Sequence, residues 1–183
     1  FICKLSEYGN IKWIRTGGST GKDYVGLGIF GSQGGMSVDY SNNIIITGQF
    51  NALFAHFGAD SIKGFSNTSD IWFAKYAPNG NLLFCKSTSG GYGTGKAFVH
   101  DLQTGKLNDI IMSGSGSQNG TMIDSIDIPN ISQGLVAGNP FVARYDSLGK
   151  ILWLRARGGL NTTSSTGGAV SGGACSIDGQ GNV

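Results

Sequence analysis

Two glycine-rich segments have the spacing of nucleotide-binding loops, and neither has the other residues that such a loop needs. Residues 90–96 read GGYGTGK and match the first seven positions of a phosphate-binding loop. The eighth position should be a Ser or Thr that holds magnesium, but it is Ala97, and residues 97–114 predict a hairpin instead of a helix. Residues 26–31 spell GxGxxG without a flanking βαβ unit or an acidic partner. We predict no cofactor and interpret both segments as loops between strands.

The ionisable residues form no pattern typical of a metal or nucleophilic site. His56 and His100 are the only histidines, and neither has a second His or Cys at ligand spacing, so we predict no metal. The three cysteines are far apart, which indicates small apolar strand residues or, alternatively, one pair that closes on folding. No GxSxG motif occurs, and we predict no catalytic residue. We interpret Asp39, Asp101 and Asp178 as capping residues of repeat-equivalent turns.

Three serines follow an aspartate and precede an apolar residue. They are Ser61, Ser125 and Ser147, and this pattern resembles the acceptor for periplasmic O-glycosylation in one phylum of Gram-negative bacteria. The alternative is that a chain rich in Ser and Thr matches such a short pattern by chance. We take the three serines as candidate O-glycosylation sites, and we expect Ser61 and Ser125 to lie where a loop leaves a sheet.

The elements that must position these residues come from a repeat. Three segments match one another, FICKLSEYGNIKWIR from residue 1, WFAKYAPNGNLLFCK from residue 72 and FVARYDSLGKILWLR from residue 141. Their turn glycines are Gly9, Gly80 and Gly149, which lie 71 and 69 residues apart. A large aromatic residue follows each glycine by four positions, and a basic residue follows the aromatic by two. A repeat of this length indicates a stacked repeat architecture.

A second motif lies between the copies of the first. It reads GGMSVDYSNNIIITG from residue 34 and GGACSIDGQGNV from residue 172, with a middle copy that ends in IIMSG. Each period therefore predicts two hairpins, or four strands, joined by turns that contain Gly, Asp and Asn. Apolar residues occupy both faces of several strands, as in sheets packed on both sides, and no segment has helical periodicity. We predict an all-β fold with β-propeller blades of four antiparallel strands, an incomplete ring of about two and a half blades.

The copies resemble the SBBP-type β-propeller repeat. The resemblance rests on DIWFAKY at residues 70–76 with GNLLF at 80–84, and on DGQGNV at 178–183, and it covers nearly the whole chain. It implies a large secreted or surface-displayed bacterial protein with no single shared activity. We divide the propeller fragment into a partial first blade at residues 1–50, a second blade at 51–117 and a truncated third blade at 118–183.

Composition excludes several partners. Only 13% of the residues are charged, the net charge is +2 and no basic stripe is present, so we predict no nucleic-acid binding. No apolar run approaches the roughly 20 residues that span a bilayer. Both ends of the sequence read as interrupted blades, so we expect the remaining blades of the same protein, or other chains, to complete the ring.

The sequence therefore predicts a non-enzymatic extracellular scaffold, adhesion or binding segment of a larger secreted repeat protein, located outside the cell or at its surface. The variable loops at 51–69 and 118–140 are the expected binding elements, for a surface glycan or a protein. The alternative is part of a propeller enzyme that acts on glycans, with most catalytic residues in missing blades and Asp60, Asp124 and Asp127 as the local carboxylates. Alone, the segment should be marginally stable or should associate, because its end sheets would expose apolar faces.

Overall fold

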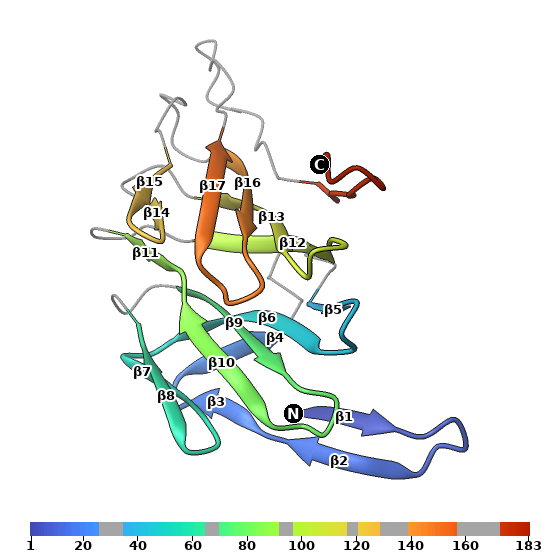
Figure 1. The fold of residues 1–183 in the computed structure, drawn as a ribbon. Coiled ribbons are helices and arrows are strands. Elements are labelled where there is room, and N and C mark those ends of the chain that lie inside the picture. The colour runs from blue at the N-terminus through green and yellow to red at the C-terminus, as the bar shows by residue number, and fades with distance from the viewer. Residues whose placement is uncertain (26–34, 65–69, 92–96, 117–120, 129–138, 157–172) are drawn as a thin grey trace.

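The computed structural model describes residues 1–25, 35–64, 70–91, 97–116, 121–128, 139–156 and 173–183. Within these ranges the fold is all-β and antiparallel, and no residue is helical, as the sequence predicted. Figure 1 shows the strands stacked in chain order, with the two ends of the chain at opposite ends of the stack. The strands are β1 (Ile2–Leu5), β2 (Ile11–Arg15), β3 (Gly17–Ser19), β4 (Lys22–Val25), β5 (Met36–Val38), β6 (Ile44–Asn51), β7 (Phe54–Phe57), β8 (Asp60–Lys63), β9 (Asp70–Tyr76), β10 (Leu82–Ser87), β11 (Ser89–Gly91), β12 (Ala97–Thr104), β13 (Ile110–Gly116), β14 (Thr121–Ile123), β15 (Ile126–Asp127), β16 (Asn139–Tyr145) and β17 (Ile151–Ala156).

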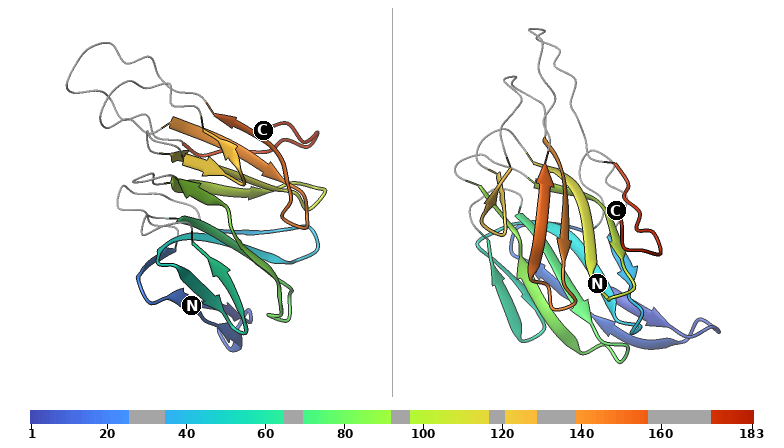
Figure 2. Two further views of the ribbon diagram at one scale, coloured as in Figure 1. Left: turned by 90° about the vertical axis from the view of Figure 1, so that its left-hand side faces the viewer. Right: turned by 45° about the horizontal axis from the view of Figure 1, so that its top comes forward.

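Two large sheets and one hairpin make up the stack. The middle sheet has the order β10-β9-β6, and β4 and β5 both pair along the remaining edge of β6. The last sheet has the order β12-β13-β16-β17. The first hairpin is β1-β2 and corresponds to the β9-β10 and β16-β17 pairs of the sheets that follow. The views in Figure 2 show the hairpin and the two sheets lying one above another.

The sheets do not coincide with the division at 50/51 and 117/118. β6 pairs with β9 and β13 pairs with β16, so the first division point falls within β6, before its last residue, and the second falls between two strands of the last sheet. The unit visible in the structure is a meander of four strands in which the two predicted hairpins are neighbours.

The turns that join β1 to β2, β9 to β10 and β16 to β17 have one design. In each, the glycine amide donates to the carbonyl three residues earlier, over 2.8 to 3.0 Å. Gly9, Gly80 and Gly149 have φ values of 79°, 84° and 80°, which disfavour a residue with a Cβ. The pairing register shifts next to each turn, as expected for a turn followed by a bulge. The repeated glycine of the sequence is therefore a conformational requirement.

Two small sheets were not predicted. β3 pairs with the β7-β8 hairpin, and β11 pairs in the same way with β14-β15. The single strand comes directly after the last strand of one repeat: β3 follows β2, and β11 follows β10. The hairpin that pairs with it lies in the chain between two strands of the next large sheet, β7-β8 between β6 and β9, and β14-β15 between β13 and β16. The segments expected to be variable loops therefore carry ordered hairpins that tie consecutive repeats together.

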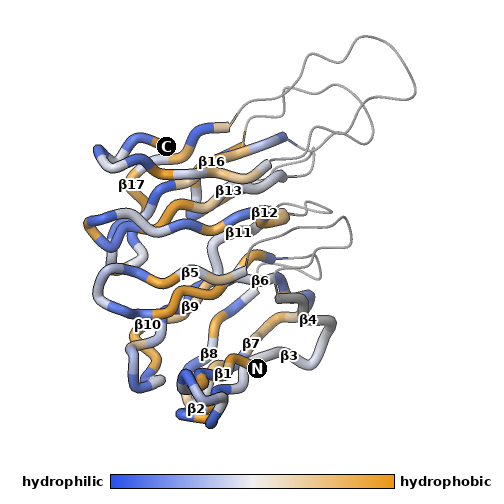
Figure 3. The backbone as a smooth tube through the Cα atoms, turned by 90° about the vertical axis from the view of Figure 1, so that its right-hand side faces the viewer, coloured by the Kyte–Doolittle hydropathy of each residue, from blue (hydrophilic) through white to orange (hydrophobic). Residues whose placement is uncertain are grey.

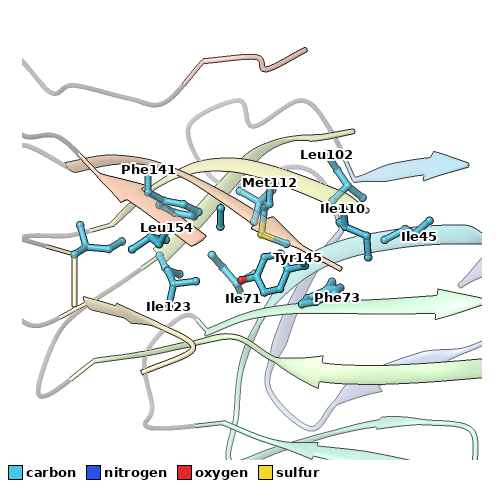
Figure 4. Close-up of a cluster of buried hydrophobic side chains, with 14 residues drawn as sticks. Ile45, Ile71, Phe73, Leu102, Ile110, Met112, Ile123, Phe141, Tyr145 and Leu154 are labelled. Atoms are coloured by element: carbon cyan, nitrogen blue, oxygen red, sulfur yellow. The ribbon is translucent and has the colours of Figure 1, made fainter. Parts of the chain in front are cut away.

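The core lies between the sheets. β6 is buried along seven residues, and β9 and β13 along their whole length, because each strand is covered on both faces. One cluster joins the middle and last sheets through Ile45, Phe73, Met112 and Tyr145, as Figure 4 shows. A second cluster joins the first hairpin to the middle sheet. In Figure 3 β6 and β9 are hydrophobic along much of their length, whereas the tight turns at the left edge are mostly hydrophilic.

Candidate functional site

The three candidate glycosylation serines occupy different settings. Ser61 lies within strand β8 and pairs with His56, so it does not lie where a loop leaves the sheet. Ser125 is in the two-residue turn of the β14-β15 hairpin with a φ of 66°. Both are exposed, whereas Ser147 is half-buried in the β16-β17 turn and its carbonyl accepts a hydrogen bond from Lys75. Modification of these serines stays a prediction, and Ser61 and Ser125 are the more accessible pair.

The nucleotide-like segments show no helix where the structure describes them. Gly90 and Gly91 belong to β11, and Ala97 begins β12 of the predicted hairpin. Residues 26–31 and 92–96 lie outside the described residues. In the parts of the chain that are described, no group of three or more His, Cys, Asp or Glu could hold a metal ion. The same parts contain no helix long and apolar enough to cross a membrane.

The pair that most resembles a catalytic arrangement is His100 with Ser115. His100 Nε2 and Ser115 Oγ are 2.9 Å apart across β12 and β13, and burial lowers the pKa of the imidazole. No hydrogen bond among the described residues joins a carboxylate to His100, so nothing orients the ring as in a hydrolytic triad. The contact gives a hydrogen-bond partner to the half-buried His100 and to the buried Ser115. The three cysteines are all free and half-buried. Cys3 and Cys85 lie on strands β1 and β10 as expected, whereas Cys175 lies outside the described strands.

A buried ion pair joins the turn that follows β5 to strand β9. Lys75 Nζ lies 2.8 Å from Asp39 Oδ2, and the two side chains are 4% and 0% exposed. Burial alone would raise the pKa of Asp39, but hydrogen bonds from Lys75 and Asn43 outweigh it and lower that pKa. Asp39 also accepts the amides of Ser41 and Asn43 and so caps its turn as predicted.

The last sheet has an equivalent ion pair, but its carboxylate comes from a different position of the turn. Arg144 occupies the position of Lys75, and its Nε lies 2.7 Å from Asp109 Oδ2. The turn position equivalent to Asp39 is Gly105, where a Cβ would collide with Asp109. The prediction that Asp101 is the equivalent turn residue was wrong, because Asp101 lies within β12 and accepts the amide of Cys175. Asp178 caps its turn in the same way as Asp39.

The repeated aromatic and basic residues join one repeat to the next through a contact that we call the turn lock. The Trp13 ring covers Gly80, so that a Cβ there would come within 2.8 Å of the ring. Trp13 Nε1 donates to the carbonyl of Pro78 over 3.0 Å, and Arg15 Nε donates to the carbonyl of Gly80 over 2.7 Å. These contacts therefore hold the β9-β10 turn of the middle sheet against the first hairpin.

The second lock uses Phe84 and Lys86. A Cβ on Gly149 would lie 2.9 Å from the Phe84 ring, and Lys86 Nζ donates to the Gly149 carbonyl over 2.9 Å. Lys86 also lies 2.9 Å from Asp124 Oδ1 and 5.4 Å from the centre of the Tyr145 ring, which ties the second small sheet to this lock. The sequence showed the spacing of these residues, but it did not show that they act on the next repeat.

The first small sheet presents a mixed outer face. Phe54 is opposite Lys63 and His56 is opposite Ser61, so the four side chains lie on one face, and all four are exposed. In the β14-β15 hairpin of the second small sheet the exposed residues are Ser125, Ile126 and Asp127. Figure 1 shows both small sheets on the same side of the stack. Hairpins at the same place in consecutive repeats therefore carry different side chains. The three carboxylates of the alternative enzyme hypothesis lie on two different sheets: Asp60 on the first small sheet, and Asp124 and Asp127 on the second.

Comparison with known proteins yields one distant likeness. No family model matches the chain. Over 181 residues the chain is 27% identical to an uncharacterized WD repeat-containing protein of Acanthamoeba polyphaga mimivirus, with 92% of this chain and 12% of that protein covered. The chain thus spans about an eighth of the length of that curated relative. The likeness suggests a β-propeller-like repeat family, and it does not support the SBBP-type repeat in particular.

Proposed function

We propose that the chain is a segment of a β-propeller that serves as a non-enzymatic binding scaffold, with the small sheets as its binding elements. Two antiparallel sheets stacked face to face support the proposal, because the middle one contains the four-strand order β5-β6-β9-β10 and the last one the order β12-β13-β16-β17, as expected for neighbouring propeller blades. The distant WD-repeat relative is consistent with this architecture, since such repeats form four strands per blade. An extracellular or cell-surface location is part of the proposal and rests on the Asp-Ser pattern alone.

One observation carries the binding role. The β7-β8 and β14-β15 hairpins are inserted at the same place in consecutive repeats, yet their exposed residues differ in charge and size. The tight turns, in contrast, keep the same hydrogen bonds from one repeat to the next. A fixed framework that displays variable side chains at one place is typical of a recognition surface.

The test compares two faces of the same chain. The immobilised protein should retain specific proteins or glycans from the surface fraction of its source cells. The double variant Phe54→Ser with Lys63→Ser should lose most of this retention, because both residues belong to the outer face of the first small sheet. The matched control is Tyr40→Ser with Leu107→Ser, two exposed residues of the opposite turns, and it should retain binding. Equal loss in both variants, or hydrolysis of polysaccharide by the unmodified protein, would contradict the proposal.

A further inference from the structure

The turn between β9 and β10 carries an Asn-Gly pair. Asn79 is exposed, whereas Gly80 is buried. Asn followed by Gly is the pair most prone to deamidation, because glycine has no side chain to hinder attack of its backbone nitrogen on the Asn side chain. In the other two turns of this design the residue before the glycine is Tyr8 or Leu148, so of the three turns only this one has the reactive pair.

The reaction needs no partner other than water. The backbone nitrogen of Gly80 attacks Cγ of Asn79, so that an N–Cγ bond forms and the Cγ–Nδ2 bond breaks. The proton of the Gly80 amide leaves with the side-chain amino group as ammonia. Water then opens the cyclic imide at either carbonyl and leaves aspartate or isoaspartate at position 79. Isoaspartate has an additional carbon atom in the main chain.

In the closed turn both reacting groups are held by other partners. The amide of Gly80 donates to the carbonyl of Ala77 over 2.8 Å. The Oδ1 atom of Asn79 accepts the amide of Asn81 over 3.0 Å. Both hydrogen bonds must break before the nitrogen of Gly80 can reach Cγ of Asn79. The closed turn is therefore the unreactive conformation of the pair.

The first hairpin keeps this turn closed. Trp13 Nε1 and Lys4 Nζ both donate to the carbonyl of Pro78, over 3.0 and 3.1 Å. Arg15 Nε donates to the carbonyl of Gly80 over 2.7 Å. Figure 1 shows the turn beside β1 and β2, the strands that supply these donors. The reactivity of Asn79 therefore depends on a contact with another repeat and not on the turn alone.

We propose that Asn79 is a site of spontaneous deamidation whose rate is set by the turn lock with the first hairpin. When the lock opens, the Asn79-Gly80 pair can form the cyclic imide. The isoaspartate product places an extra carbon atom between the carbonyl of Ala77 and the amide of Gly80, so the turn can no longer close with the same geometry. A transient separation of two repeats is thereby converted into a permanent one.

The test follows position 79 by peptide mass spectrometry while the full chain is incubated in mildly alkaline buffer, with chromatography to separate the aspartate and isoaspartate forms. Conversion in the folded chain should be slower than in the chain unfolded in urea by about a hundredfold, because the turn must first open. Trp13→Ala removes the covering ring and one donor, and it should accelerate conversion in the folded chain by about tenfold or more. Arg15→Met replaces Trp13→Ala if circular dichroism shows that the latter is unfolded.

The matched control is Met112→Ala. Met112 is fully buried in the cluster between the middle and last sheets, so its loss destabilises the chain without touching the turn lock. Conversion at Asn79 should remain at the rate of the unmodified chain. Equal acceleration by Met112→Ala and Trp13→Ala would show that deamidation follows global unfolding and not the lock. Equal rates in the folded and the urea-unfolded chain, or no conversion in urea, would likewise overturn the proposal.

Discussion

At the scale of single residues, the structure separates two aspartates that look alike in the sequence. Asp39 and Asp178 accept the same turn amides, and each accepts a hydrogen bond from the Asn four residues later. Only Asp39 faces a buried cation, Lys75, among the described residues. Capping was predictable from the Asp-Asn pattern, but the ion pair was not, because its partner comes from a different hairpin.

The two aspartates give a matched pair of variants. Asp39→Asn keeps the turn acceptor but leaves Lys75 without its counter-ion, and it should lower the free energy of unfolding by about 3 kcal/mol at neutral pH. Asp178→Asn should leave stability unchanged. The folded-state pKa of Asp39 is lowered, so its contribution is complete above the unfolded pKa of about 3.9 and disappears as the pH falls through the folded pKa. Urea denaturation from pH 7 to pH 3 should therefore show the unmodified chain and Asp39→Asn converging in acid, and a pH-independent difference would contradict this account.

At the scale of the elements, sequence and structure agree where the pattern is local. The four-residue turns, the positive φ at their glycines and the hairpin at residues 97–114 follow from Gly, Asp and strand alternation. The small sheets were missed because β3 and β11 are three-residue segments of Gly and Ser, which carry no apolar alternation, and their partners are far along the chain. The turn lock was missed for a related reason: spacing shows that a residue repeats, but not which repeat it touches.

Two glycine turns measure what the lock contributes. Gly58→Ala introduces only the strain of an Ala at positive φ, which should cost about 1 kcal/mol. Gly80→Ala adds a collision with the Trp13 ring, so we expect a total loss of about 3 kcal/mol, with the excess arising from overpacking. In a Trp13→Ala background, Gly80→Ala should lower the free energy of unfolding by no more than Gly58→Ala does. Equal losses for the two glycines in the unmodified chain would show that Trp13 does not hold the Gly80 turn.

At the scale of the whole molecule, the account describes a stack in which each repeat holds the turn of the next. The all-β class and the repeated pair of hairpins were predictable from the sequence, because they depend on composition and on the period of the repeat. The proposed binding surface was only partly predictable. The sequence indicated the inserted segments as candidate binding loops, but their pairing as small sheets and their exposed residues came from the structure.

The most direct test of this account is amide hydrogen exchange at the three turn glycines. Their amides make the same internal hydrogen bond, to Ser6, Ala77 and Asp146, so the three turns differ mainly in the lock above them. The account predicts exchange at Gly80 and Gly149 slower than at Gly9 by about tenfold or more, because the covering ring must lift before the amide opens. Equal exchange rates at all three glycines would contradict the claim that the repeats are held together by their turns.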